Sequence, residues 1–343
     1  MKYKLCFPLL MVVILVSCET NHNSEINALF EGYSGKLPGA AAMVIQNGDI
    51  LYQGTFGMAD IDQGIAVSDS SNFRLASVTK QFTAMAILQL MDDNQLNFNT
   101  SLREIFPAFP MYAADINYGH LLHHTSGLLD YEGLIADSAT VPVRDADVLD
   151  LLLLQDTTRF LPGSDYSYNN GGYALLALTV ERISGMPFQD YLKENIFKPL
   201  QMHTSVAFLK GYNEVPNRAY GYYLKDHSIL FSDQSMTSSV LGDGGIYTSL
   251  KDMYKWDQAL YGTTLVSQAM IDSAFTPWLD TYGCGWRIEP YKGHERISHT
   301  GSTCGFRNVY QRFPDSNLSI VVLTNRRDPG VQYLAEAIAD LYL

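Results

Sequence analysis

The stretch that most constrains the fold is Ser77-Val78-Thr79-Lys80 together with the apolar segment that follows it. The apolar residues recur at helical spacing and predict a helix over 79–91. A helix that is apolar on most of its surface has to be buried inside a domain. Ser77 and Lys80 are three residues apart, so they share one helix face and lie about 4.5 Å apart along its axis. The apolar positions are Val78, Phe82, Met85, Ala86, Leu88 and Leu90.

This pair of residues suits nucleophilic catalysis. A serine hydroxyl is a weak nucleophile until a base takes its proton, and the amine of a desolvated lysine is such a base. A serine in the first turn of a helix also lies near unpaired backbone amides, which favour developing negative charge. A serine helix cap beside a surface lysine explains Ser77 and Lys80 equally well, so the catalytic interpretation needs support from elsewhere in the chain.

Two later segments supply that support. One contains Tyr168-x-Asn170 and the other contains His299-Thr300-Gly301. In order and spacing, the three segments resemble the active-site elements of the serine β-lactamase and penicillin-binding protein family, which are Ser-x-x-Lys, Tyr-x-Asn and Lys/His-Thr-Gly. Class C β-lactamases, D-alanyl-D-alanine peptidases and related esterases are the most similar in motif type. Further segments resemble family landmarks in family order, at 38–40, 57–60, 121–128, 199–202, 283–286 and 323–325, so the resemblance covers residues 25 to 343.

The resemblance assigns a role to each motif residue. Ser77 is expected to be the acylated nucleophile and Lys80 its base, and Tyr168 a second proton carrier whose phenolate is stabilised by nearby positive charge. Asn170 is expected to present its amide to a substrate carbonyl. The backbone N–H groups of Ser77 and Ser302 are expected to form the oxyanion hole, which needs no particular side chain.

The third motif departs from the lysine that is commoner in β-lactamases. By resemblance, His299, Thr300 and Gly301 bind the substrate. An imidazole with an ordinary pKa near about 6.5 changes its charge through neutral pH, so His299 would hold a substrate carboxylate only when protonated or through a hydrogen bond. Arg326 and Arg327 are alternative sources of fixed positive charge, or simply solvated arginines after a strand.

These features predict an exported serine hydrolase that forms an acyl-enzyme at Ser77. Its substrate would be a small molecule or a peptide, including cell-wall peptide: D-alanyl peptides, β-lactams, or small esters and amides. His299 favours a peptidase or esterase over an efficient β-lactamase, and we find no separate glutamate for deacylation. The alternative is a catalytically weak penicillin-binding or ligand-sensing lipoprotein on the same scaffold. The motifs alone do not choose the substrate, and nothing indicates the oligomeric state.

The N-terminal sequence predicts an export signal. Lys2 and Lys4 precede an apolar run over 5–16, which is too short to span a bilayer but suits a signal peptide. Residues 15–18, Leu-Val-Ser-Cys, resemble a bacterial lipobox, although an ordinary signal peptide with an incidental cysteine fits too. We expect a signal peptide at 1–17, a lipidated Cys18 and tether at 18–24, and a lipoprotein anchored in the membrane and facing the periplasm or the cell exterior.

Charge and composition exclude several partners. Removing residues 1–17 removes two of the 23 basic residues and none of the 36 acidic ones, which leaves 21 − 36 = −15. Such a surface suits neither nucleic acid nor anionic lipid, so membrane attachment would come from acyl chains. His120 and His124 are four residues apart, but no third ligand of suitable spacing accompanies them, so we predict no metal site. No glycine-rich phosphate loop is present, and we predict no cofactor.

Strand patterns lie at the two ends of the chain, with mostly helical patterns between them. We predict strands over 41–46 and 50–56 joined by a turn at Asn47-Gly48-Asp49. Further strands are predicted over 285–291, 296–299, 308–313 and 318–324, and a closing helix over 331–341. The predicted fold is α+β, an antiparallel sheet flanked by helices and built from both chain ends. The sheet lobe would comprise 25–75 and 280–343, and the inserted helical lobe 76–279. Cys284 and Cys304 fall on neighbouring predicted strands, either as a disulfide or as two buried small residues.

Overall fold

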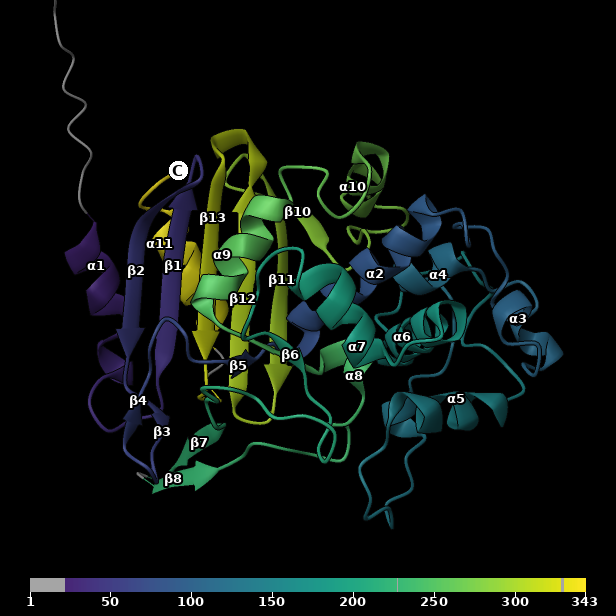
Figure 1. Cartoon of the computed structure of the whole chain (residues 1–343), viewed down its shortest axis with the longest axis horizontal. Coiled ribbons are helices and arrows are strands. Elements are labelled where there is room, and N and C mark those ends of the chain that lie inside the picture. Colours follow the sequence, from purple (N-terminus) through teal and green to yellow (C-terminus); the bar gives the residue numbers. More distant parts are fainter. Residues whose placement is uncertain (1–21, 227, 328–329) are drawn as a thin grey trace, which may run out of the picture.

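The structure is a computed structural model that describes residues 22–226, 228–327 and 330–343 (Figure 1). The predicted signal peptide and Cys18 lie outside the described residues. Within the described residues, no helix combines the length and apolar character needed to cross a bilayer.

A six-stranded sheet is built from both ends of the chain, in the order β10-β11-β12-β13-β1-β2, and every neighbouring pair is antiparallel. β1 from the N-terminal part pairs with β13 from the C-terminal part, with Ala40 opposite Thr324. The sheet confirms the predicted α+β fold. Its strands are β1 (Ala40–Gln46), β2 (Asp49–Phe56), β10 (Arg287–Tyr291), β11 (His294–Thr303), β12 (Phe306–Phe313) and β13 (Leu318–Thr324).

The first hairpin forms where the sequence predicts it. β1 and β2 pair up to Gln46 and Asp49, which leaves Asn47 and Gly48 as a two-residue turn. Both turn residues have positive φ, 53° and 86°. This is the requirement of a type I′ turn, whose twist matches that of the two strands.

Other elements cover both faces of the sheet, and β1 is therefore buried on both sides. Ala40, Ala42 and Val44 pack with the terminal helices α1 (Asn23–Leu29) and α11 (Val331–Ala339). The alternate residues of β1 belong to the larger core, which continues through α9 (Leu250–Ala259) and into the helical region. Figure 1 shows α9 in front of the sheet and α11 behind it.

The helix that starts at the Ser-x-x-Lys motif is at the centre of the helical region. It is α2 (Lys80–Asp92), and every side chain from Lys80 to Leu88 is buried, as its apolar pattern predicts. It packs against α6 (Asn170–Ser184), which begins at an Asn169 cap and ends at Gly185, whose φ is +70°. The other helices are α3 (Leu102–Ile105), α4 (Tyr118–Leu122), α5 (Asp145–Leu153), α7 (Phe188–Leu192), α8 (Leu241–Gly244) and α10 (Gln268–Ala274).

Short strands join the sheet to the helical region. A three-stranded sheet has the order β5-β9-β6, and two hairpins, β3-β4 and β7-β8, lie at one end of the molecule (Figure 1). Their bounds are β3 (Met58–Asp60), β4 (Ile65–Ala66), β5 (Phe73–Arg74), β6 (Val206–Ala207), β7 (Tyr222–Lys225), β8 (Ser228–Phe231) and β9 (Ile246–Thr248). Cys284 is buried and Cys304 is partly exposed, and both are free thiols, so the disulfide alternative is wrong.

Candidate active site

Ser77 lies in a 3₁₀ turn, Ala76–Thr79, that leads directly into α2. The residue before it, Ala76, is buried and has a φ of +51°. A non-glycine residue in this left-handed region costs on the order of 1–3 kcal/mol and persists only where the surrounding structure holds it. The backbone is therefore strained immediately before the predicted nucleophile.

Gly301 of β11 is what lies against this turn. A Cβ atom at Gly301 would come 2.0 Å from the carbonyl oxygen of Leu75 and 3.3 Å from the Cβ of Ala76. The pairing of β10 with β11 ends at Arg287 and Ser298, so the following residues of β11 extend beyond that neighbour. Glycine is required because it lets the free edge of β11 contact the turn that carries Ser77.

Lys80 links the first two motifs. Its side chain is fully buried, and its Nζ atom donates to Ser77 Oγ at 3.3 Å, to Asn170 Oδ1 at 2.8 Å and to the backbone carbonyl of Asp243 at 2.9 Å. An ammonium group has three donors, and all three have acceptors here. The structure therefore brings Ser77, Lys80 and Asn170 together, as the motif spacing predicts.

Two acidic side chains beside Lys80 were not predicted. Asp243 accepts a hydrogen bond from the Tyr131 hydroxyl at 2.9 Å, and burial raises the pKa of Asp243 to about 6. Glu132 accepts one from Asn170 Nδ2 at 3.1 Å, and its pKa is raised by burial and then by the charge of Asp130. Glu132 is thus a glutamate at the site that the sequence analysis missed.

One signal in the sequence points toward Asp243. It lies in the glycine-rich run Leu241-Gly242-Asp243-Gly244-Gly245. A Cβ at Gly242 would come 2.2 Å from the carbonyl oxygen of Tyr173, so this run is glycine-rich because it packs backbone against backbone. No comparable signal marks Glu132.

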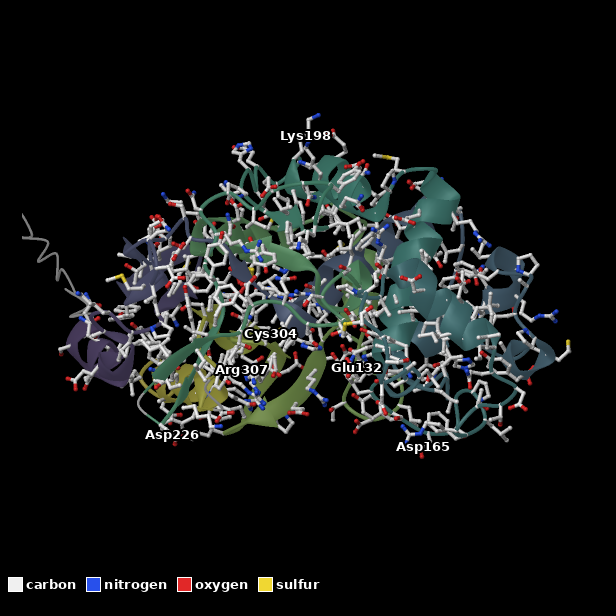
Figure 2. All side chains as sticks on the ribbon, turned by 90° about the horizontal axis from the view of Figure 1, so that it is seen from below. Glu132, Asp165, Lys198, Asp226, Cys304 and Arg307 are labelled. Atoms are coloured by element: carbon white, nitrogen blue, oxygen red, sulfur yellow. The ribbon has the colours of Figure 1, made fainter. Side chains whose placement is uncertain are left out.

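A hollow opens over Ser77 at the junction of sheet and helices. Ser302 lines the same hollow as Ser77 and Asn170, which is where the predicted second oxyanion donor is needed. Seen from below, Figure 2 places Glu132 and Cys304 near the middle of the molecule, where the two regions meet. The lining residues are Arg74, Ala76, Ser77, Glu132, Asn170, Thr237, Asp243, Gly244, Ser302 and Thr303.

Tyr168 reaches the site with its ring but not with its hydroxyl. The Lys80 ammonium lies 4.9 Å from the centroid of the Tyr168 ring. The Tyr168 hydroxyl is buried and has no hydrogen-bond partner among the described residues. Catalytic hydrogen bonds often form only with substrate bound, so this geometry leaves the predicted role open.

His299 differs from the prediction. It is buried, its Nδ1–H donates to the carbonyl oxygen of Thr300 at 2.7 Å, and its Nε2 accepts from the Tyr282 hydroxyl at 2.8 Å. Burial, and then the charge of Lys80, lower the pKa of His299 from 6.5 to about 3. The expectation that His299 changes charge through neutral pH is therefore wrong, because this imidazole stays neutral.

Thr300 also lies apart from Ser77. Its side chain is exposed and lines a different hollow, together with Arg287 and Arg296. The reason is strand alternation, which sends Thr300 to the face opposite His299 and Gly301. The motif's threonine side chain is thus not among the residues that line the hollow over Ser77.

Neither predicted arginine lines the hollow over Ser77. The Arg326 guanidinium lies over the ring of Tyr33, 3.8 Å from its centroid, and donates to the carbonyl oxygen of Gly32 at 2.6 Å. Arg327 is exposed. The contacts of Arg326 hold the N-terminal segment against the end of β13.

The two histidines considered for a metal have other neighbours. The His120 ring stacks on Trp278, and the backbone N–H of Asn117 donates to its Nδ1. His124 packs among tyrosines. In the described part of the chain, no group of three or more His, Cys, Asp or Glu side chains is placed to hold a metal ion.

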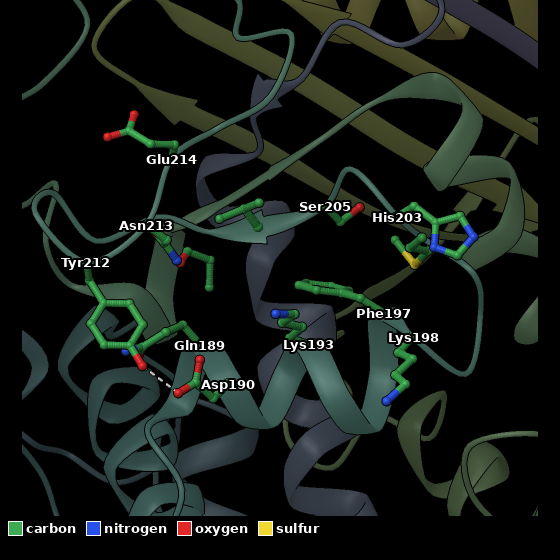
Figure 3. Close-up of a pocket in the computed structure, with 13 residues that line it drawn as sticks. Gln189, Asp190, Lys193, Phe197, Lys198, His203, Ser205, Tyr212, Asn213 and Glu214 are labelled. Carbon is green, nitrogen blue, oxygen red and sulfur yellow. Dashed lines mark hydrogen bonds between the residues drawn. The ribbon is translucent and has the colours of Figure 1, made fainter.

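A separate hollow of about 460 Å³ lies in the helical region (Figure 3). Phe197 and Met202 are among its lining residues, and at its edge the Tyr212 hydroxyl donates to Asp190 Oδ2 at 2.5 Å. It includes none of the residues predicted for the active site.

The comparisons with known proteins agree with this geometry. The β-lactamase family profile matches residues 26–343. The chain belongs to the β-lactamase family. It is therefore a homologue of serine hydrolases and penicillin-binding proteins, as the three motifs predicted.

Individual relatives extend over most of the chain. Penicillin-binding protein 4* of Bacillus subtilis is 31% identical over 333 residues, covering 90% of this chain and 73% of that protein. PbpX of Bacillus subtilis, named as a penicillin-binding protein, is 34% identical, covering 85% and 70%. The crystal structure of a penicillin-binding protein from Bacillus halodurans superposes with a TM-score of 0.79 at 30% identity, covering 92% of this chain and 98% of that one.

Proposed function

We propose that this chain is a peptidase or esterase that forms an acyl-enzyme at Ser77, with D-alanyl peptides or small esters and amides as substrates. The observation that carries the proposal is the contact of 3.3 Å between Ser77 Oγ and the buried Nζ of Lys80. The relatives named as penicillin-binding proteins support it, because the same serine would then be acylated by a β-lactam.

The proposed reaction has two halves. Lys80 first gives up one of the three protons that it donates in this structure, and its amine then takes the hydroxyl proton as Ser77 Oγ attacks the substrate carbonyl. The backbone N–H groups of Ser77 and Ser302 stabilise the oxyanion. The leaving group departs with a proton delivered through Tyr168. Water then attacks the acyl-enzyme and one of its protons passes to Ser77 Oγ as the ester bond breaks, which restores the serine hydroxyl and releases the acid.

The neutral state of His299 favours substrates without a carboxylate at that strand. A buried imidazole whose pKa lies at about 3 offers no charge to a substrate anion. Lys80 uses its donors on Ser77, Asn170 and Asp243. Among the proposed substrates, this favours small esters and amides over D-alanyl peptides, which end in a carboxylate, and it disfavours an efficient β-lactamase for the same reason.

The test is intact-mass analysis after parallel incubation with a penicillin, a D-alanyl thioester and a fluorophosphonate. The proposal expects a lasting fluorophosphonate adduct, turnover of the thioester and slow release of the penicillin. Stable penicillin adducts without thioester turnover would instead indicate the alternative, a penicillin-binding or sensing protein. If the protein formed no adduct with the penicillin or the fluorophosphonate and did not turn over the thioester, both hypotheses would be overturned.

We also propose that the protein is exported and held in a membrane by lipid on Cys18. The support is the sequence 15–18 after a short apolar run. Mass spectrometry of the mature N-terminus and cell fractionation test it, and Cys18→Ser should release the protein or block its processing. Wild-type protein that is wholly soluble, with an unmodified N-terminus, would contradict this proposal.

A further inference from the structure

His124 is bonded to both residues that flank Tyr168. Its backbone carbonyl accepts from the N–H of Ser167 at 2.9 Å, and its Nδ1 accepts from the N–H of Asn169 at 3.1 Å. Its ring lies against the ring of Tyr168, with centroids 4.3 Å apart. A single residue therefore holds the backbone on each side of the tyrosine and also supports its ring.

The hydrogen bonds fix the state of this imidazole. Because Nδ1 accepts a proton, the one ring proton of neutral His124 is on Nε2. His124 is 1% exposed, and burial followed by the charge of Lys80 holds its pKa well below the usual range. The Nδ1 acceptor is therefore available throughout the neutral pH range.

His124 is held in place at a cost. Its φ is +58°, a left-handed conformation that a residue with a Cβ seldom adopts. The rings of Tyr173 and Tyr282 pack around it, at 5.0 Å and 4.5 Å between centroids. Strain of this kind concentrates where a structure has to hold a functional group in one place.

The Tyr168 side chain needs such a support, because no hydrogen bond at its hydroxyl fixes its orientation. That hydroxyl is buried and has no hydrogen-bond partner among the described residues. The orientation of the phenol over Lys80 must then come from its ring contacts and from the backbone at Ser167 and Asn169.

We propose that His124 is a positioning residue, which sets the phenol of Tyr168 against Lys80 through its Nδ1 acceptor and its ring face. This rests on the proposed function, because it matters only if Tyr168 takes part in the reaction. His124 does not line the hollow over Ser77, so it would act on catalysis through its neighbours, and Tyr168 is the neighbour to which we assign that effect.

Three substitutions separate this role from mere packing. In His124→Asn, the side-chain oxygen takes the place of Nδ1, and asparagine tolerates a positive φ. His124→Gln moves the acceptor outward, toward the position of Nε2, and His124→Leu keeps bulk without any acceptor. His123→Leu is the control, because this neighbouring buried histidine bonds to the carbonyl of Gly119 and lies by Cys284.

The measurement is kcat and KM for a D-alanyl thioester, with and without Tyr168→Phe. We expect His124→Leu and His124→Gln to lower kcat by about 10- to 100-fold, less than the about 10²- to 10⁴-fold that loss of a general acid–base group itself costs, with KM changed less than about threefold. His124→Asn should recover most of the activity. In the Tyr168→Phe background, His124→Leu should cost less than about threefold, since effects that pass through one residue are not additive.

Several results would overturn the proposal. These are equal losses in both backgrounds, a glutamine variant as active as the asparagine one, or an equal loss in His123→Leu. If His124→Leu does not fold, the loss in His124→Gln, measured with and without Tyr168→Phe, decides instead. If Tyr168→Phe keeps full turnover, the positioning role falls, while fluorophosphonate labelling of Ser77 reports separately on the proposed function.

Discussion

The hydroxyl of Tyr282 donates a hydrogen bond of 2.8 Å to Nε2 of His299. The Nδ1–H of His299 donates to the carbonyl of Thr300, and because the lowered pKa keeps the ring neutral, Nε2 carries no proton and accepts from Tyr282. His299 therefore acts as a neutral, internally bonded residue. The position that a lysine commonly fills in β-lactamases carries no charge here.

The first prediction concerns recognition of carboxylates. Because the pKa of His299 is about 3, its charge does not change between pH 6 and 8. The pH profiles of kcat/KM for an acidic and a neutral substrate with the same acyl group should then be parallel over that interval. Selective loss of the acidic substrate as pH rises would show that His299 titrates there. His299→Lys should favour the acidic substrate.

The second prediction concerns the effect of the lowered pKa of His299 on the free energy of unfolding. Below about pH 6.5 this imidazole is protonated in the unfolded chain but stays neutral in the folded protein. Acid therefore lowers the free energy of unfolding. With the folded pKa at about 3, the loss should approach about 1.4 kcal/mol per pH unit between pH 6 and 4. His299→Gln should lack this component. Denaturant unfolding of both proteins at several pH values measures it, and identical slopes would contradict the assignment.

The third prediction uses Tyr168→Phe. The hydroxyl is buried and makes no hydrogen bond with the described residues, so its removal should leave the free energy of unfolding unchanged or raise it by about 1 kcal/mol. Turnover should nevertheless fall by about 10²- to 10⁴-fold, the usual contribution of a proton carrier. Near-normal turnover would remove Tyr168 from the mechanism, and a large loss of stability would show an unrecognised contact.

The fourth prediction concerns Gly301→Ala. The new Cβ would come 2.0 Å from the carbonyl oxygen of Leu75, so β11 has to move away from the turn of Ser77. We expect the rate of fluorophosphonate labelling to fall by at least 10-fold, because a small misplacement of reacting groups is costly. Gly262→Ala is the matched control, since its Cβ meets nothing within 4 Å. Equal labelling rates in both variants would refute the proposed contact.

What the sequence could predict was set by local spacing. Ser77 and Lys80 share one helical turn, and Asn47-Gly48 specifies its own hairpin, so both follow from neighbouring residues. Pairing of the two chain ends could be inferred because the predicted strands lie there, whereas the short strands in the middle of the chain, β6 to β9, were not predicted. The register of the strands and their exact ends could not be predicted. For example, β11 runs from His294 to Thr303, well beyond the predicted 296–299.

Contacts between residues that are distant in the sequence could not be predicted. The Nδ2–H of Asn170 donates to Glu132 across 38 positions in the sequence, and Lys80 donates to the Asp243 carbonyl across 163 positions. No local pattern encodes such contacts. The prediction that His299 changes its charge through neutral pH was wrong for a related reason. Burial and the contact with the Tyr282 hydroxyl decide that charge, and neither can be read from neighbouring residues. Strand alternation, in contrast, could have shown that Thr300 points away from His299.

The central claim is that Ser77 carries the covalent intermediate, and the most direct test is peptide mapping after fluorophosphonate and penicillin labelling. Wild-type protein should carry one adduct, on the peptide that contains Ser77. Ser77→Ala should carry none while remaining folded, and Lys80→Met should label at least 10²-fold more slowly because the base is gone. An adduct on any other serine, or unchanged labelling of Ser77→Ala, would contradict the account.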